Sequence, residues 1–166
     1  VYKRQFQTWL EQRLADADPY FYALRDAATG TALGLASLMR IDPANRVIEV
    51  GNILFSPKLQ RSVAATEAMY LLARYAFELG YRRYEWKCNA HNLPSRRAAE
   101  RLGFVYEGLF RQHMIIKGRN RDTAWFAMLD RDWPAVQRGF ELWLDPANFD
   151  AQGKQRNGLA ALRAQG

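Results

Sequence analysis

Residues 60–67 carry the first chemical signal in the sequence, because small residues and an arginine open a predicted helix there. A helix N-terminus offers backbone N–H groups without intrahelical partners and the positive end of the macrodipole. Small side chains at Ser62, Ala64 and Ala65 let a ligand approach that backbone, and Arg61 adds a positive charge. The segment could therefore bind a phosphate or pyrophosphate. An ordinary capped helix would have the same pattern, so this segment alone leaves both interpretations open.

Cysteine and histidine suggest two other kinds of chemistry, and both hypotheses are weaker. Cys88, His91 and His113 could indicate a metal site, but a fourth ligand is missing and the carboxylates show no ligand spacing, so we expect no metal. Cys88 as a nucleophile would need a neighbouring base. It lies on a segment that alternates like a strand, where a cysteine is expected to pack in the core.

The elements before residue 60 must position this segment. Apolar residues at helical spacing predict a helix over Gln5 to Ala15. Three strands should follow, joined by short turns at Ala28–Gly30 and Asp42–Asn45, and they form an antiparallel meander. The predicted strands are Tyr20–Arg25, Thr31–Arg40 and Arg46–Phe55.

The second half of the chain is predicted to alternate between helices and strands. Ser62 caps a predicted helix that ends near Leu79, and Asn92 or Ser95 caps a shorter one that ends at Gly103. The remaining predicted elements are a strand over Arg83–Cys88, strands over Phe104–Ile116 and Thr123–Leu129 around a turn at Lys117–Asn120, and a helix over Trp133–Trp143. We predict an α+β fold, a mixed but mostly antiparallel twisted sheet with flanking helices. One domain should cover residues 1–145, and the Gly-, Gln- and Asn-rich residues 146–166 should form a loosely held tail.

Residues 60–65 resemble the phosphate loop of the GNAT superfamily of N-acetyltransferases, whose pattern is Gln/Arg-x-x-Gly-x-Gly/Ala. Gln60 and Ala65 match the first and last positions, whereas Val63 stands where the family usually has glycine. Valine cannot adopt a positive φ cheaply, so this departure bears on the geometry of the loop. The continuation from Ala65 to Ala68 is similar to the branch that includes ribosomal-protein N-terminal (alanine/serine) acetyltransferases.

A second segment, Asn92 to Phe104, resembles that branch's Asn-x-x-Ser-x-x-x-x-x-x-x-Gly-Phe signature. The usual downstream spacing of that branch is completed by Glu107, Gly108, Arg111, Asp122 and Trp133. The resemblance covers Val47 to Trp133 and implies the GNAT fold. The family's first strand and part of its first helix would precede Val1. Since the sequence also begins without an initiator Met, we expect a processed, truncated or fragmentary chain.

The resemblance implies how acetyl-coenzyme A, the acetyl donor, would bind. Two parallel strands, residues 47–55 and 83–88, would splay apart and admit the pantetheine arm. Asn92 would hydrogen-bond that arm, and Ser95 would lie near the departing thiol. The residues expected to contact the cofactor are Phe55, Gln60, Arg61, Ser62, Val63, Ala64, Ala65, Thr66, Asn92 and Ser95.

Transfer to an amine requires the amine to lose a proton and the thiolate to be stabilised. Glu49, on the third strand, is the candidate general base, acting directly or through water, and Ser95 is the second catalytic candidate. The alternative for Glu49 is a carboxylate that faces outward or is paired with an arginine. Tyr106 is a possible proton donor, although a core or surface aromatic is the alternative. A backbone N–H of the splayed strand would hold the oxyanion, but the sequence does not assign it.

Composition and charge narrow the function classes. The chain has 166 residues with 49% hydrophobic residues, which fits one globular domain, and the absence of a long apolar run excludes a membrane helix. The net charge of +7 favours an anionic partner, but without a polybasic tract nucleic acid is the weaker hypothesis. A single cysteine suits a reducing cytoplasm. We expect direct acetyl transfer from acetyl-CoA to a primary amine, such as a protein N-terminus or a small amine, by a monomer or homodimer. The alternatives are a basic RNA- or ribosome-associated module, and a CoA-binding member without turnover.

Overall fold

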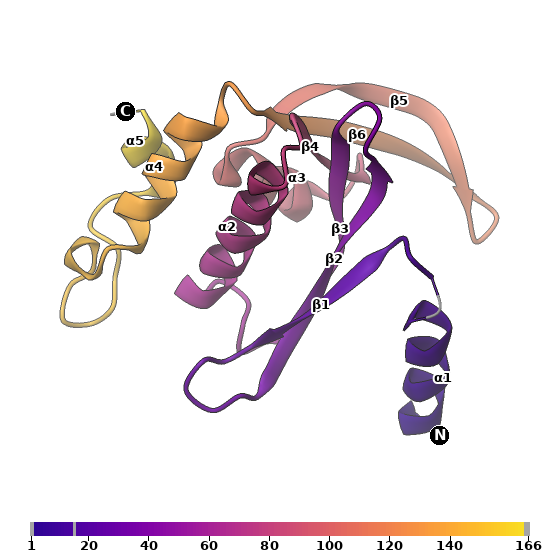
Figure 1. The fold of residues 1–166 in the computed structure, drawn as a ribbon, viewed down its shortest axis with the longest axis horizontal. Coiled ribbons are helices and arrows are strands. Elements are labelled where there is room, and N and C mark those ends of the chain that lie inside the picture. The colour runs from indigo at the N-terminus through magenta and orange to yellow at the C-terminus, as the bar shows by residue number, and fades with distance from the viewer. Residues whose placement is uncertain (1, 15, 165–166) are drawn as a thin grey trace.

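The computed structural model describes residues 2–14 and 16–164 and contains a six-stranded sheet with helices on both sides (Figure 1). Across the sheet the strands are β1 (Tyr20–Arg25), β2 (Ala32–Asp42), β3 (Val47–Phe55), β4 (Arg83–Asn89), β6 (Arg119–Leu129) and β5 (Val105–Ile116). All neighbouring strands are antiparallel except β3 and β4, which are parallel. The predicted α+β class and mixed, mostly antiparallel sheet are confirmed.

The helices lie on both faces of the sheet. They are α1 (Tyr2–Leu14), α2 (Val63–Glu78), α3 (Leu93–Leu102), α4 (Trp133–Leu144), the short 3₁₀ helix η1 (Pro146–Asn148) and α5 (Leu159–Arg163). On β1, Tyr22 contacts Tyr75 of α2, whereas its neighbour Phe21 contacts Trp9 of α1. Since successive strand residues point to opposite faces, α1 and α2 lie on opposite sides of the sheet (Figure 1). No helix in the described part of the chain is long and apolar enough to cross a membrane.

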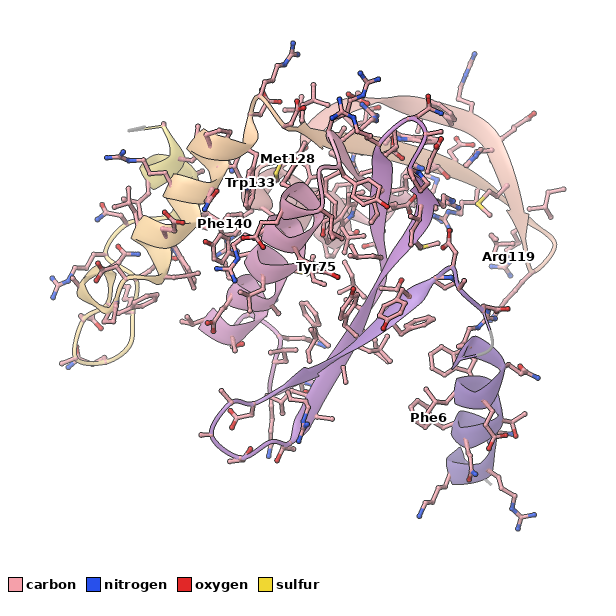
Figure 2. The ribbon with its side chains drawn as sticks, in the orientation of Figure 1. Phe6, Tyr75, Arg119, Met128, Trp133 and Phe140 are labelled. Atoms are coloured by element: carbon pink, nitrogen blue, oxygen red, sulfur yellow. The ribbon has the colours of Figure 1, made fainter. Side chains whose placement is uncertain are left out.

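The apolar core fills the space between the sheet and α2, α3 and α4. Alternate residues of β4 and β6 face it, including the fully buried Tyr84 and Phe126. Figure 2 shows Trp133 and Phe140 of α4 turned toward α2, where both rings pack against Tyr70. Burial of these large rings holds α2 and α4 on this face of the sheet.

Several element boundaries differ from the sequence prediction by a few residues, and of the two caps predicted for α3 the structure has the first. Asn92 rather than Ser95 is the N-cap of α3, because its side chain accepts a hydrogen bond from the Ser95 backbone N–H at 3.1 Å. β6 begins at Arg119 rather than Thr123, because Lys117 and Gly118 both adopt positive φ and form a two-residue hairpin turn. The predicted end of the first helix at Ala15 lies outside the described residues.

The residues after Asp145 pack onto the domain, in contrast to the loosely held tail expected from their composition. Leu159 and Leu162 of α5 are buried, and the Trp143 indole donates a hydrogen bond to Gln155 at 2.8 Å. The Asn148 amide donates to the backbone carbonyls of Trp143 and Asn157. Asparagine and glutamine here tie a loop to α4, a role that composition alone does not reveal.

Candidate active site at the diverging strands

The parallel strands β3 and β4 diverge in the middle of the sheet. Their pairing runs from Val47 opposite Arg83 to Val50 opposite Trp86 and then ends. Beyond this point β3 stays paired with β2, and β4 with β6. A β-bulge around Asn52, whose φ is 50°, adds one residue to β3 and bends it just past the last parallel pair.

Two helices start at the opening that this divergence creates. α2 follows β3 and α3 follows β4, so both N-termini lie beyond the carboxyl ends of the two parallel strands. In sheets with parallel strands, ligands bind at this edge where neighbouring strands separate. The two segments predicted to hold the acetyl donor, residues 60–66 and 92–95, therefore each follow the carboxyl end of one strand of the parallel pair.

The predicted phosphate loop is a turn of left-handed and extended backbone that leads into α2. Ser62 is the N-cap, and its hydroxyl accepts a hydrogen bond from the Ala65 N–H at 3.1 Å. Within the described residues the N–H groups of Val63 and Ala64, the first two of α2, have no intramolecular acceptor. The positive φ falls on Arg61, at 59°, and not on Val63. The valine in place of glycine is therefore accommodated within the helix and leaves the backbone donors available.

Other predicted residues of this loop hold the loop itself together. The Gln60 amide donates to the Phe55 carbonyl at 2.9 Å, and the Ser62 hydroxyl donates to the Leu59 carbonyl at 2.7 Å. Thr66 is buried, and its hydroxyl accepts a hydrogen bond from Arg101 at 3.1 Å. The side chains of Gln60, Ser62 and Thr66 thus shape the loop, while the backbone remains the group that can meet a phosphate.

Ser95 lies where the parallel pairing ends. Its hydroxyl oxygen accepts a hydrogen bond from the indole N–H of Trp86, the last residue of β4 that pairs with β3, at 3.1 Å. The hydroxyl proton can still be donated to a ligand in the opening. Cys88 lies on the same face of β4, where it packs in the core and burial raises the pKa of its thiol, which disfavours the reactive thiolate.

Glu49 lies on the other face of the sheet and is paired with two cations. Its Oε2 is 2.6 Å from Arg40 and 2.8 Å from the Lys87 ammonium, and the Glu49 and Lys87 side chains are only 5% and 7% exposed. Lys87 also contacts Glu85 at 2.7 Å, and Glu85 contacts Arg83 at 2.6 Å. Of the two arrangements considered for Glu49, the structure has the carboxylate paired with an arginine. Its role as the general base stays a prediction.

Hydrogen bonds favour the ionised forms of Glu85 and Arg83 in this network. Burial opposes charge on Glu85, but the hydrogen bonds from Lys87 and Arg83 outweigh burial and hold the pKa of the carboxyl below its ordinary value. Hydrogen bonds from Arg83 to Glu107 of β5, together with those to Glu85, raise the pKa of the guanidinium. The charges alternate in sign from β2 to β5, so each is compensated by its neighbours.

Sequence reasoning missed three features of this region. The Gly51-Asn52 pair within a strand is a bulge signal, and a Cβ at Gly51 would lie 2.5 Å from the Met39 sulfur. Arg40 adopts a positive φ of 48° at a second bulge, on β2, and its backbone N–H donates a hydrogen bond to the Asp18 carboxylate. Alternation along residues 83–88 places Lys87 on the face opposite Cys88, but it does not reveal that Lys87 is one of the buried charges. Alternation gives the face of a residue but not what covers it.

Two further arrangements bear on the other hypotheses. Cys88 faces the core, whereas His113 packs against Trp125 on the opposite face, so these two do not share a site. In residues 2–14 and 16–164, no three His, Cys, Asp or Glu residues are placed to hold a metal ion.

A cavity of about 680 Å³ lies between the β1–β2 hairpin and α2 and meets the phosphate loop at Ala64, but Glu49, Asn92 and Ser95 do not line it.

Comparison with known proteins agrees with this geometry. Residues 2–105 match the family model of the Acetyltransferase (GNAT) domain. A crystal structure of a GCN5-related N-acetyltransferase from Brucella melitensis superposes with a TM-score of 0.94 and 53% identity, covering 97% of this chain and 73% of that one.

Curated relatives match at lower identity. Bacillus subtilis (strain 168) YdaF, whose name relates it to ribosomal N-acetyltransferases, is 31% identical over 63% of this chain. The ribosomal-protein-serine acetyltransferase of Escherichia coli (strain K12) is 28% identical over 58% of this chain. The matches span only 57% and 54% of those relatives' own lengths. The family model, the superposition and the diverging strands agree, and the chain belongs to the GNAT family of acetyltransferases.

Proposed function

We propose that the protein transfers the acetyl group of acetyl-CoA to a primary amine by direct attack within a ternary complex. The observation that carries the proposal is the opening between β3 and β4, where the parallel pairing stops at Val50 and Trp86 and two helix N-termini follow. A long, thin ligand can enter between two strands that separate, and its phosphates can meet the helix N-termini.

The residues present fit acetyl-CoA. The backbone N–H groups of Val63 and Ala64 and the macrodipole of α2 suit the pyrophosphate, and the exposed Arg61 adds a cation. Asn92 and Ser95 would face the pantetheine arm and the thiol from the start of α3. When bound, acetyl-CoA supplies an activated acetyl group whose thiolate is the leaving group.

We propose catalytic roles only for groups on β3 and α3 near the opening. Ser95 would donate its hydroxyl proton toward the departing thiolate, since its oxygen is already oriented by Trp86. A backbone N–H of β3 near the bulge at Asn52 would stabilise the oxyanion. Glu49 would act as the general base in this scheme against the pull of Arg40 and Lys87, which both contact its Oε2 and stabilise the ionised carboxylate.

The acceptor proposed is a protein N-terminus or a small amine. A relative named for acetylating a ribosomal protein on serine supports a protein acceptor, and the net charge of +7 disfavours a polycationic one. We propose a cytoplasmic location, consistent with the buried free Cys88.

Thermal unfolding with acetyl-CoA, followed by free-thiol release with a panel of amines, tests the proposal. The panel contains serine- and alanine-initiated hexapeptides, spermidine and an aminoglycoside. We expect acetyl-CoA to raise the Tm and at least one amine to release thiol. Stabilisation without thiol release would indicate a CoA-binding protein without turnover. Affinity for RNA that falls steeply with salt, without a response to acetyl-CoA, would indicate a nucleic-acid-binding module.

A further inference from the structure

An aromatic cluster lies on the same face of the sheet as Glu49. Phe110 of β5 packs against Trp125 of β6 with a ring separation of 4.2 Å, and His113 packs against both, at 5.6 and 5.8 Å. The Lys87 ammonium, which contacts Glu49, lies 3.9 Å from the centre of the Trp125 ring. Trp125 is opposite Lys87 in the sheet, so the cluster lies beside the first residue of β4 after the parallel pairing ends.

A bulge in β5 creates the position of His113. Phe110 pairs with Thr123 and Met114 with Arg121, so three residues of β5 stand opposite one residue of β6. Gln112 takes a positive φ of 50°, and its N–H donates to Asp122 at 2.7 Å. Bulges of this kind redirect a side chain, and here the imidazole is turned onto Trp125.

The orientation of His113 leaves one ring nitrogen accessible. Nδ1 lies 3.0 Å from the Thr123 hydroxyl, and Thr123 is only 1% exposed and therefore fixed in place. When Nδ1–H donates to that hydroxyl, the lone pair is on Nε2. His113 itself is exposed, so a substrate or a water molecule can reach Nε2.

We propose that His113, rather than Glu49, takes the proton from the acceptor amine, with Phe110 and Trp125 forming the wall against which the acceptor packs. The proposal rests on the acetyl transfer proposed above. Two cations contact the Oε2 atom of Glu49 and stabilise the negative charge of this carboxylate, which is buried. The imidazole is exposed, oriented and on the same face.

The proton and bond changes balance as follows. The ammonium of the acceptor gives one proton to His113 Nε2, directly or through water. The free amine attacks the thioester carbonyl, so that a C–N bond forms and the C–S bond breaks. Ser95 gives its hydroxyl proton to the departing thiolate and regains one from the second proton of the attacking nitrogen, directly or through water, and His113 returns its proton to solvent.

Several charged groups surround this imidazole. Arg111 lies on the same bulge, Asp122 and Arg121 lie across the hairpin on β6, and the Lys87 ammonium lies over the Trp125 ring. Asp122 is engaged with Gln112 and Asn120, and these hydrogen bonds hold the pKa of its carboxyl below the ordinary value.

The test compares His113→Gln, Glu49→Gln and His91→Gln in thiol-release assays with acetyl-CoA and a serine-initiated hexapeptide, or the fastest amine of the panel. The chain has only two histidines, so His91 is the matched control. We expect His113→Gln to lower kcat about 100-fold and to remove the decrease of kcat between pH 8 and pH 5. His91→Gln should keep both the rate and the pH profile of the wild type.

Two further variants separate chemistry from structure. Free imidazole should partly restore the rate of His113→Ala, which a structural role would not allow. Thr123→Val should keep the fold, alter the pH profile and lower kcat less than His113→Gln. If His113→Gln keeps the wild-type profile, or if Glu49→Gln alone removes the acid limb, the proposal is wrong. If the wild type releases no thiol with any amine, the proposed function itself fails.

Discussion

At the scale of single residues, the buried charges on β3 and β4 are a group whose members depend on one another for stability. Lys87 bridges two carboxylates, and its side chain is almost fully enclosed. Removing one member of a buried ionic network leaves its partners with uncompensated charge, which costs far more than loss of an exposed pair.

Replacement of Lys87 by methionine should therefore destabilise the fold strongly. We expect a loss of about 3 kcal/mol in the free energy of unfolding, at the lower end of the range for buried pairs because Arg40 and Arg83 remain. Urea unfolding measures this loss. Arg74→Met, which removes the exposed pair with Glu78, is the control and should cost less than about 1 kcal/mol. Equal losses in the two variants would contradict a buried role for Lys87.

Glu85 should make the stability sensitive to acid. Its pKa is lower in the folded protein than in the unfolded chain, so the ionised form stabilises the fold above the unfolded value, and this stabilisation is lost as the pH falls through the folded value. Glu85→Gln should thus be less stable than the wild type at about pH 7, and the difference should shrink as the pH falls below about 4. Urea unfolding across this range checks the sign. A difference that grows on acidification would show that the carboxyl is not held ionised.

At the scale of elements, the turn before α2 contains Arg61, which has a strained backbone conformation and for which we also propose a role in binding. Arg61 adopts a left-handed conformation, which costs a non-glycine residue about 1 kcal/mol or more. The same residue brings a cation to the loop that we propose for the pyrophosphate.

Arg61→Gly should therefore change stability and affinity in opposite directions. Relief of the backbone conformation should raise the free energy of unfolding by up to about 1 kcal/mol, whereas loss of the cation should weaken acetyl-CoA binding. Chemical unfolding and calorimetric titration measure the two effects. Lys58→Gly, which removes an exposed charge of the same turn at a position without positive φ, should lower stability instead. A fall in stability for Arg61→Gly would refute the assignment of strain.

Much of this architecture could be predicted from sequence, because its signals are local. Helical periodicity, the Ser62 cap and the Gly103 stop marked α2 and α3, and short turns marked the meander of β1 to β3. The bulges at Arg40, Asn52 and Gln112 could not be predicted in the same way, since each depends on a partner on a neighbouring strand. The charges around Glu49 come from four strands, and only the sheet order brings them together.

At the scale of the whole molecule, the C-terminal segment is part of the packed structure. α5 lies against α4, with Leu159 only 2% exposed (Figure 1). Arg163 of α5 donates a hydrogen bond to the Arg101 carbonyl of α3 at 3.2 Å, which ties the segment to a helix of the candidate site.

Leu159→Ala should consequently destabilise the whole domain. Removal of a fully buried leucine side chain costs about 2–5 kcal/mol through lost transfer energy and the cavity that remains. Leu142→Ala on α4, where the leucine is 39% exposed, is the matched control and should cost clearly less. Thermal unfolding followed by circular dichroism compares them. A Leu159→Ala protein as stable as the control would indicate that α5 does not contribute to the core.

The central claim concerns the opening between β3 and β4, and turnover of acetyl-CoA tests it most directly. Purified protein is incubated with acetyl-CoA and each amine of the panel, and free thiol and N-acetylated amine are quantified in the same samples. The account predicts that at least one amine yields thiol and acetylated product in equal amounts. Absence of both products with every amine, in protein that acetyl-CoA does not stabilise, would contradict it.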